Sequence, residues 1–340
     1  MSLNNQSTME TTDFDTSDVP LGFKGIVNLK IRSNNIDELS IPVFVIKGNQ
    51  PGKTITVLGG VHGDEYDGPQ AIRDIYTSLE PDELSGTFLG VPHSNIPAFL
   101  AGTRVSPIDG LNLARIFPGN ENGSITEKIA NSLGRNVIRH ADFFIDLHSS
   151  GTYMSMPLLI GYYSGSNQIA KDSQKAAFNF GTDVVWGHSD ISKGRTISYA
   201  HHLGIPWLYS ECPGGGWLDL YHIEKYVAGV KNVMQMLGII SFPINAFTPK
   251  HYLIGSGDVD KSITTTTTGY LLPNVDLLQN VKMGQIIAKV IDLSGNEIET
   301  IEANVTGVVI CMRKTPSVKP NTLAFLITAT DNIVSTLGTI

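Results

Sequence analysis

The sequence predicts a three-layer α/β domain with a mostly parallel, mixed sheet, followed by a small all-β module. Short apolar runs alternate with longer segments of helical period between about residues 20 and 240. From about Pro249 the helical periods vanish, and short β-type runs are separated by Gly, Pro and Asn. The first pattern is typical of a parallel sheet covered by helices, and the second of an all-β module.

Strands and helices of the first domain can be predicted from periodicity. Apolar runs predict strands at 55–60, 87–92, 143–148, 157–161 and 205–211. A helical period predicts helices at 68–79, 125–138 and 221–237. Ligands of such sheets bind beyond the carboxyl ends of the strands, so the residues that follow each strand are the first candidates for a site.

The module is predicted to contain five strands, at 269–274, 284–292, 297–304, 307–313 and 322–329. Five consecutive threonines at 264–268 favour extended chain and are expected to enter the first of them. Residues 1–18 are polar and hold no apolar run, which predicts a disordered leader. The α/β domain is therefore expected over residues 19–245 and the β module over residues 246–340.

The composition excludes several classes of partner. A chain of 340 residues with 41% apolar and 16% charged residues is long enough for one large and one small domain. The net charge of -8 and the lack of a basic run argue against nucleic-acid binding. No run approaches the ~18 apolar residues that cross a bilayer. Two cysteines without a CxxC pattern fit a reducing compartment, so a cytoplasmic location is predicted.

Two strand ends carry residues that bind metals. The run GGVHGDEY places His62 and Glu65 three residues apart, so a turn or a helix start would bring both side chains to one side. His148 ends the strand FFIDLH. Two histidines and one glutamate form a ligand set of catalytic zinc, whose fourth position is left to water. Asp64 and Asp67 are competing carboxylates, and the spacing alone leaves that choice open.

A further carboxylate, Glu211, lies between an apolar strand and three glycines. A carboxylate beside metal-bound water can accept its proton and later deliver it to a leaving amine. Asp146, two residues before His148, could orient a metal-binding side chain without itself contacting the metal. The neighbouring Cys212 has no His or Asn at the spacing of a thiol nucleophile, which favours a small buried residue.

Two arginines, Arg104 and Arg115, lie in a segment too rich in Gly and Pro for a regular helix, GTRVSPIDGLNLARIFPG. The planar fork of an arginine matches a carboxylate, and it can also stabilise an oxyanion. Surface ion pairing is the common alternative. Two arginines among turn residues favour contact with a substrate.

Four stretches, GGVHGDEYDGP, GTRVSPIDGLNLARIFPG, FFIDLHSSG and SECPGGG, together resemble the succinylglutamate desuccinylase/aspartoacylase family of zinc carboxypeptidase-like hydrolases. The resemblance spans roughly residues 25–335 and is greatest to deacylases of small N-acylated amino acids, including N-acetyl-diaminobutyrate. It implies a zinc-carboxypeptidase-like domain, one Zn²⁺ per chain and a lipoyl-like module at the C-terminus.

The resemblance also implies a role for individual residues. The zinc ligands would be His62, Glu65 and His148, and Glu211 would be the general base and acid. Arg104 would polarise the scissile carbonyl, while Arg115 and Asn112 would bind the substrate. One position departs from the family, which usually reads Asn-Leu-Asn-Arg where this chain has Ala114 before Arg115. The missing amide predicts a different or differently oriented acyl amino acid.

The resulting prediction is zinc-dependent hydrolysis of an amide bond in a small N-acyl amino acid, by a homo-oligomer. A zinc carboxypeptidase that acts on peptides is an alternative, and a non-catalytic binding protein is a less favoured one. Lipoyl-like modules can also carry a cofactor on a lysine at a hairpin tip. The expected tip, residues 292–296, has no lysine. The module is therefore expected to shape or cover the mouth of the site, or to bury surface in an oligomer.

Overall fold

The computed structural model describes residues 7–31, 39–242 and 247–329. Its centre is a ten-stranded mixed sheet in which most neighbouring strands are parallel, in the order β1-β2-β3-β5-β4-β6-β10-β8-β9-β11. The strands are β1 Ser7–Thr11, β2 Lys24–Ile31, β3 Leu39–Lys47, β4 Gln50–Gly59, β5 Ser85–Val91, β6 Phe143–Leu147, β8 Leu159–Tyr163, β9 Val184–His188, β10 Trp207–Glu211 and β11 His251–Ile254.

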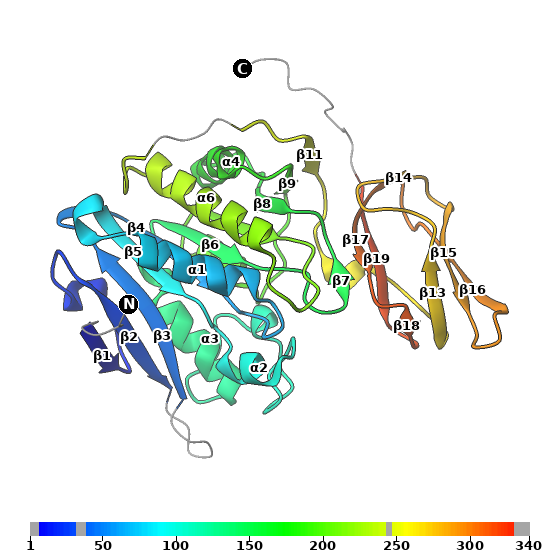
Figure 1. Cartoon of the computed structure of the whole chain (residues 1–340), viewed down its shortest axis with the longest axis horizontal. Helices are drawn as coiled ribbons and strands as arrows, with labels where there is room; N and C mark the ends of the chain where they lie inside the picture. The colour runs from blue at the N-terminus through cyan, green and yellow to red at the C-terminus, as the bar shows by residue number, and fades with distance from the viewer. Residues whose placement is uncertain (1–6, 32–38, 243–246, 330–340) are drawn as a thin grey trace.

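Helices cover both faces of this sheet (Figure 1). One apolar core joins the sheet to α1 (Asp67–Ser78), α4 (Gln168–Phe180) and α6 (Leu220–Met236). A second core joins the opposite face to α3 (Ile125–Asn136) and α5 (Thr196–His202). The short helix α2 (Ile96–Ala101) follows β5. The predicted three-layer α/β architecture is confirmed.

The helices begin where local chemistry favours it. At the start of α3, the carboxylate of Glu127 accepts a hydrogen bond from the backbone N–H of Ser124 at 2.8 Å, which completes a capping box.

The predicted strands and helices of the α/β domain are present, with ends shifted by up to a few residues. The strands β1, β2, β3, β9 and β11 and the helices α2, α4 and α5 were not predicted individually. In β2, buried and partly exposed residues alternate strictly, as in a strand with one covered face.

The leader predicted over residues 1–18 is wrong for the part that the structure describes. Residues 7–11 form β1, which pairs in parallel with β2. Phe14 and Val19 are buried in the core beneath α3, and the backbone N–H of Phe14 donates to the side-chain oxygen of Asn136 at 2.9 Å. Two apolar anchors and one edge strand order a segment whose average composition is polar. Residues 1–6 lie outside the described residues.

The module forms two antiparallel sheets around its own small apolar core. Each of the five predicted strands is present, and the tip of the hairpin between β15 and β16 lies at residues 292–296, as predicted. Of the threonine run, only Thr264 enters a strand. The strands are β12 Ile263–Thr264, β13 Gly269–Pro273, β14 Asn280–Val281, β15 Ile286–Ile291, β16 Glu297–Glu302, β17 Gly307–Arg313, β18 Ser317–Val318 and β19 Leu323–Thr328.

The module packs against one end of the large sheet. The short strand β7 (Met154–Ser155) pairs with β17 of the module, and an apolar cluster joins Trp186 and Leu253 to Ile310 and Leu326. Strand β11, which lies beyond the expected boundary at residue 245, pairs with β9 and belongs to the large sheet. The segment from Gly255 to Ser262 then connects the two parts. None of the described helices is both long and apolar enough to cross a membrane.

Candidate active site

Three neighbouring parallel strands end at the same edge of the large sheet. The strands β4, β6 and β10 are consecutive and parallel, so their carboxyl ends lie side by side. His62 and Glu65 follow β4, His148 follows β6, and Glu211 is the last residue of β10. The candidate residues that follow these strands therefore lie at one edge of the sheet.

The loop after β4 presses closely against α2. A Cβ atom at Gly63 would overlap the backbone of Ala98, so only glycine lets the chain pass there. Gly63 lies between His62 and Glu65 in the chain, so this close approach helps to fix the positions of both residues and of the start of α1. His62 is 3% exposed and Glu65 2% exposed, so both side chains are held inside the protein.

Glu65 lies between the two histidines. Its Oε1 is 2.8 Å from Nδ1 of His62, and its Oε2 is 2.8 Å from Nδ1 of His148. One donor atom of each residue lies within 4.8 Å of the others, so the three side chains could hold one metal ion. Their imidazole and carboxylate donors are those that zinc binds in catalytic sites.

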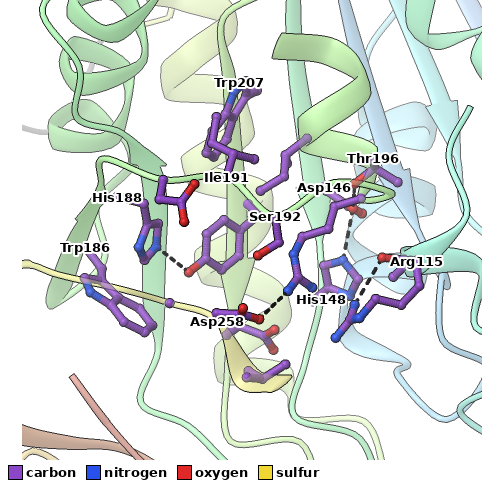
Figure 2. A pocket seen from close by; sticks show the side chains of 18 of the residues that line it. Arg115, Asp146, His148, Trp186, His188, Ile191, Ser192, Thr196, Trp207 and Asp258 are labelled. Atoms are coloured by element: carbon purple, nitrogen blue, oxygen red, sulfur yellow. Dashed lines mark hydrogen bonds and ion pairs between the residues drawn. The ribbon is translucent and has the colours of Figure 1, made fainter. Parts of the chain in front are cut away.

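The far nitrogen of each ring has its own oxygen partner. Asp146 Oδ2 is 3.0 Å from Nε2 of His148 and accepts a hydrogen bond from the hydroxyl of Thr196. Figure 2 shows Asp146 between Thr196 and His148. Asn112 Oδ1 is 3.2 Å from Nε2 of His62 and accepts from the backbone N–H of Ala114 at 2.9 Å. Such partners hold the proton on Nε2 and leave the Nδ1 lone pair to a metal.

The charges of this group are strongly coupled. Burial and the charge of Arg104 lower the pKa of His62 to about 4. Burial alone would lower the pKa of His148, but Asp146 and Glu65 outweigh it and raise that pKa. Burial would likewise raise the pKa of Glu65, and the two histidines outweigh it and lower that pKa. The carboxylate is thus held in its charged form, in which it can bind a cation.

The two competing carboxylates turn elsewhere. Asp64 Oδ2 accepts a hydrogen bond from the backbone N–H of Thr152 at 2.9 Å. Asp67 accepts from the backbone N–H of Asp219 at 3.0 Å and lies near Cys212. Among the three acidic residues of the loop, Glu65 is the one grouped with both histidines.

Glu211 lies in the same cavity as His62 and His148. Its Oε2 is buried and has no hydrogen-bond partner among the described residues. Burial and the nearby Glu65 carboxylate raise the pKa of Glu211 to about 8. A carboxyl group with a raised pKa and a free oxygen in a cavity is suited to exchange protons with a ligand.

The two predicted arginines both line the cavity but have different partners. Arg104 is 45% exposed at its side chain and donates to Oε1 of Glu65 at 3.3 Å, next to the candidate metal ligands. Arg115 donates to both carboxylate oxygens of Asp260, at 3.0 and 3.1 Å. Asp260 lies in the segment that leads to the module and is 58% exposed at its side chain. The guanidinium expected to grip a substrate carboxylate is therefore paired with a carboxylate of the protein.

Asn112 lies next to His62, and Ala114 lies next to Arg115. Asn112 faces His62 and is not among the residues that line the cavity, whereas Ala114 is. The backbone carbonyl of Ala114 accepts a further hydrogen bond from Arg115 at 3.1 Å.

The rest of the cavity wall was not predicted from the sequence. This part of the wall includes Arg195, Tyr209 and two residues of β9, Trp186 and His188. Residues 256–259 of the connecting segment complete it. None of the lining residues belongs to the described strands of the module. Tyr209 could have been found, because it lies two residues before Glu211 on the same face of a predicted strand. His188 would have followed from the rule of strand ends, had β9 been predicted.

Comparison with known proteins agrees with the fold. A family model of the succinylglutamate desuccinylase/aspartoacylase catalytic domain matches residues 51–237, which is more than half of the chain. The chain is 29% identical over 298 residues to an N-alpha-acetyl-L-2,4-diaminobutyric acid deacetylase of Halomonas elongata, covering 86% of this chain and 85% of the relative.

Two solved structures share both the fold and the extent of the chain. A succinylglutamate desuccinylase from Silicibacter sp. TM1040 has a TM-score of 0.82 at 26% identity, covering 92% of this chain and 97% of that one. The product-bound ectoine utilization protein EutE from Ruegeria pomeroyi has a TM-score of 0.81 at 26% identity, covering 92% and 98%. The chain therefore belongs to the succinylglutamate desuccinylase/aspartoacylase family, as its motifs predicted.

Proposed function

We propose that this protein is a zinc-dependent deacylase that hydrolyses the amide bond of a small N-acyl amino acid. The observation that carries the proposal is the group of His62, Glu65 and His148 at the wall of a cavity that also contains Glu211. The relative from Halomonas elongata is a deacetylase of an acetylated diamino acid, which supports the same reaction class here.

The residues present fit a zinc ion. Both histidines direct Nδ1 toward the same carboxylate, and both have an oxygen partner at Nε2. A zinc ion bound by these residues would act as a Lewis acid and lower the pKa of a bound water molecule. A dication in this position would also lower the pKa of Glu211 from its raised value, so that the carboxylate is charged near neutral pH.

The reaction that we propose uses two groups of the chain at the scissile bond. Glu211 accepts a proton as water attacks the carbonyl carbon, and it then donates that proton to the departing amine nitrogen. Arg104 donates to the carbonyl oxygen as negative charge develops on it. The amide and water thus become a carboxylate and a free amine.

The ion pairs of Arg115 and Arg195 support a substrate with one carboxylate. Arg115 lines the cavity but is engaged by Asp260, and Arg195 donates to Asp258 at 2.9 Å. Because two protein carboxylates already neutralise these arginines, substrates with several negative charges are disfavoured. We propose that a single substrate carboxylate displaces Asp260 from Arg115.

The test is a screen of N-acyl amino acids against the zinc-loaded protein, read out as free amine. We expect release of amine from small acetylated amino acids and no cleavage of a peptide library assayed beside them. Cleavage of peptides with a free C-terminus instead would favour a carboxypeptidase. A protein that binds no zinc and releases no amine would contradict the proposal. The cytoplasmic location and the homo-oligomer stay predictions from the sequence.

A further inference from the structure

A second group of metal-binding side chains lies behind the candidate active site. Asp67 begins α1, Cys212 directly follows β10, and His222 lies in the first turn of α6. One donor atom of each lies within 4.8 Å of the others. None of the three lines the cavity of the candidate active site. Carboxylate, thiol and imidazole groups thus converge from three elements, of which the one with Asp67 is far in the sequence from the other two.

The group is buried but poorly compensated. Asp67 is 1% exposed and Cys212 is fully buried. The carboxylate accepts one backbone N–H at 3.0 Å, from Asp219, and one weak donor, the Cys212 thiol, at 3.6 Å. Nδ1 of His222 is buried without a hydrogen-bond partner among the described residues, and its nearest carboxylate oxygen, on Asp219, is 3.6 Å away.

This imbalance is what a cation would remove. A buried carboxylate costs free energy unless a positive charge or several hydrogen bonds compensate it, and a buried ring nitrogen without a partner adds to the cost. A metal ion bound between the three side chains would supply the missing charge and would bind a ring nitrogen of His222.

We propose that Asp67, Cys212 and His222 bind a second zinc ion, with a structural role. Mixed sulfur, nitrogen and oxygen ligands match zinc, whereas magnesium and calcium prefer oxygen alone. The side chain of His222 is 12% exposed, which gives the ion a route from solvent and leaves its fourth position to water. On binding, the Sγ–H bond of Cys212 breaks, the sulfur binds zinc, and the proton passes to solvent.

The location explains what such an ion would stabilise. Glu65 lies two residues before Asp67, and Glu211 directly precedes Cys212. Tyr226, one turn after His222 on α6, donates from its hydroxyl to the backbone carbonyl of His148 at 2.7 Å. A metal here would tie together the three elements that carry or support the candidate active site. The inference does not depend on the proposed deacylase activity.

Cobalt substitution tests the site directly, because His62, Glu65 and His148 include no sulfur. We expect the full-length protein loaded with Co²⁺ to show the near-ultraviolet absorption of a thiolate bound to cobalt. We expect zinc analysis of the zinc-loaded protein to give two ions per chain. Wild-type protein that binds one zinc ion and shows no such absorption would overturn the proposal without the need for any variant.

Variants assign the signal to its residues. Cys212→Ser should abolish the cobalt absorption and remove one zinc ion, while Cys311→Ser, which changes the other buried cysteine, should leave both unchanged. His62→Ala should lose one zinc ion and keep the absorption. If Cys212→Ser does not fold, as judged by circular dichroism, His222→Gln is the second variant and should lose the same ion. Retention of the absorption in folded Cys212→Ser would contradict the assignment.

The outcomes separate this site from the proposed function. Cobalt absorption together with the absence of any deacylase activity would sustain the second metal site and contradict the proposed function. Deacylase activity in a protein that binds one zinc ion and shows no thiolate absorption would sustain the proposed function and contradict the second metal site.

Discussion

The two candidate metal groups at this edge of the sheet differ in what surrounds them. In the group of His62, Glu65 and His148, the two histidines line a cavity, and each ring has an oxygen partner at its Nε2. The group of Asp67, Cys212 and His222 is packed between helix starts, outside that cavity.

Comparison of the two groups indicates which features suit a metal site to catalysis. Both groups combine imidazole with carboxylate, and the second adds a thiol, so donor type does not by itself indicate which group is catalytic. A reaction needs space for the substrate next to the ion, a base within that space and partners that hold the ligands in place. Within the described residues, Glu211 supplies such a base for the first group only. We therefore expect changes around the first group to affect turnover, and changes around the second to affect stability and metal content.

The largest expected effect is that of Glu211→Gln. Removing the proton acceptor should lower kcat by about a thousandfold, which lies within the usual contribution of general acid–base catalysis. Zinc content should stay unchanged, because Glu211 is not among the grouped ligands. The measurement is steady-state release of amine together with zinc analysis. The matched control is Glu224→Gln, an exposed position on α6. Full turnover in Glu211→Gln would refute the assigned role.

A smaller effect is expected from Asp146→Asn. Asp146 lies 3.0 Å from Nε2 of His148, and loss of such an orienting carboxylate typically weakens metal binding about 10- to 100-fold. Competition with a zinc chelator measures the affinity of the first site. The thiolate absorption of the cobalt-loaded protein should be unaffected, because Asp146 does not touch the second group. A change in that absorption would show that the two groups are not independent.

A change of several-fold is expected from Asp260→Asn. The substitution weakens the pair with Arg115, so a substrate carboxylate no longer competes with a charged protein group. A partly exposed ion pair is worth about 1 kcal/mol at most, which corresponds to roughly a fivefold decrease of KM. Asp276→Asn, an exposed position in the module, is the control. An increase of KM would show that Asp260 contributes to substrate binding instead of opposing it.

The smallest expected effect concerns the far wall of the cavity. Burial lowers the pKa of His188 to about 4 from the ordinary histidine value of 6.5, so the unfolded chain binds more protons than the folded chain between these values. Stability therefore falls as pH falls from 6.5 to 4, by about 2 kcal/mol at pH 5 for this one group.

Urea unfolding at pH 7.5 and pH 5 measures this loss. We expect His188→Gln to lose less stability over that interval than the wild type does. His202→Gln, an exposed histidine for comparison, should behave as the wild type. An equal pH dependence in wild type and His188→Gln would rule out His188 as the source.

Much of the site could be predicted because it follows strand ends. His62, Glu65, His148 and Glu211 each follow or end an apolar run that reads as a buried strand. What spacing alone left open was the choice between three acidic residues in one loop. Hydrogen bonds to Thr152 and Asp219 turn the other two away, and such partners lie too far along the chain to be predicted from local pattern.

What the sequence did not predict has the same physical origin. The segment of residues 7–18 has a polar composition, and its order depends on Phe14 packing beneath α3 and on a hydrogen bond to Asn136. The pairing of Arg115 with Asp260 joins residues 145 positions apart, so the pattern of neighbouring residues predicted contact of Arg115 with a substrate but not this ion pair.

The α/β architecture, the strands of the module, the family and the candidate residues at the strand ends could all be predicted without the structure. These follow from periodicity and from short motifs, which are properties of neighbouring residues. Only the tertiary structure decided which carboxylate joins the histidines, which guanidinium is already paired, and that Asp67, Cys212 and His222 meet. Each of these depends on side chains that packing brings together from distant parts of the chain.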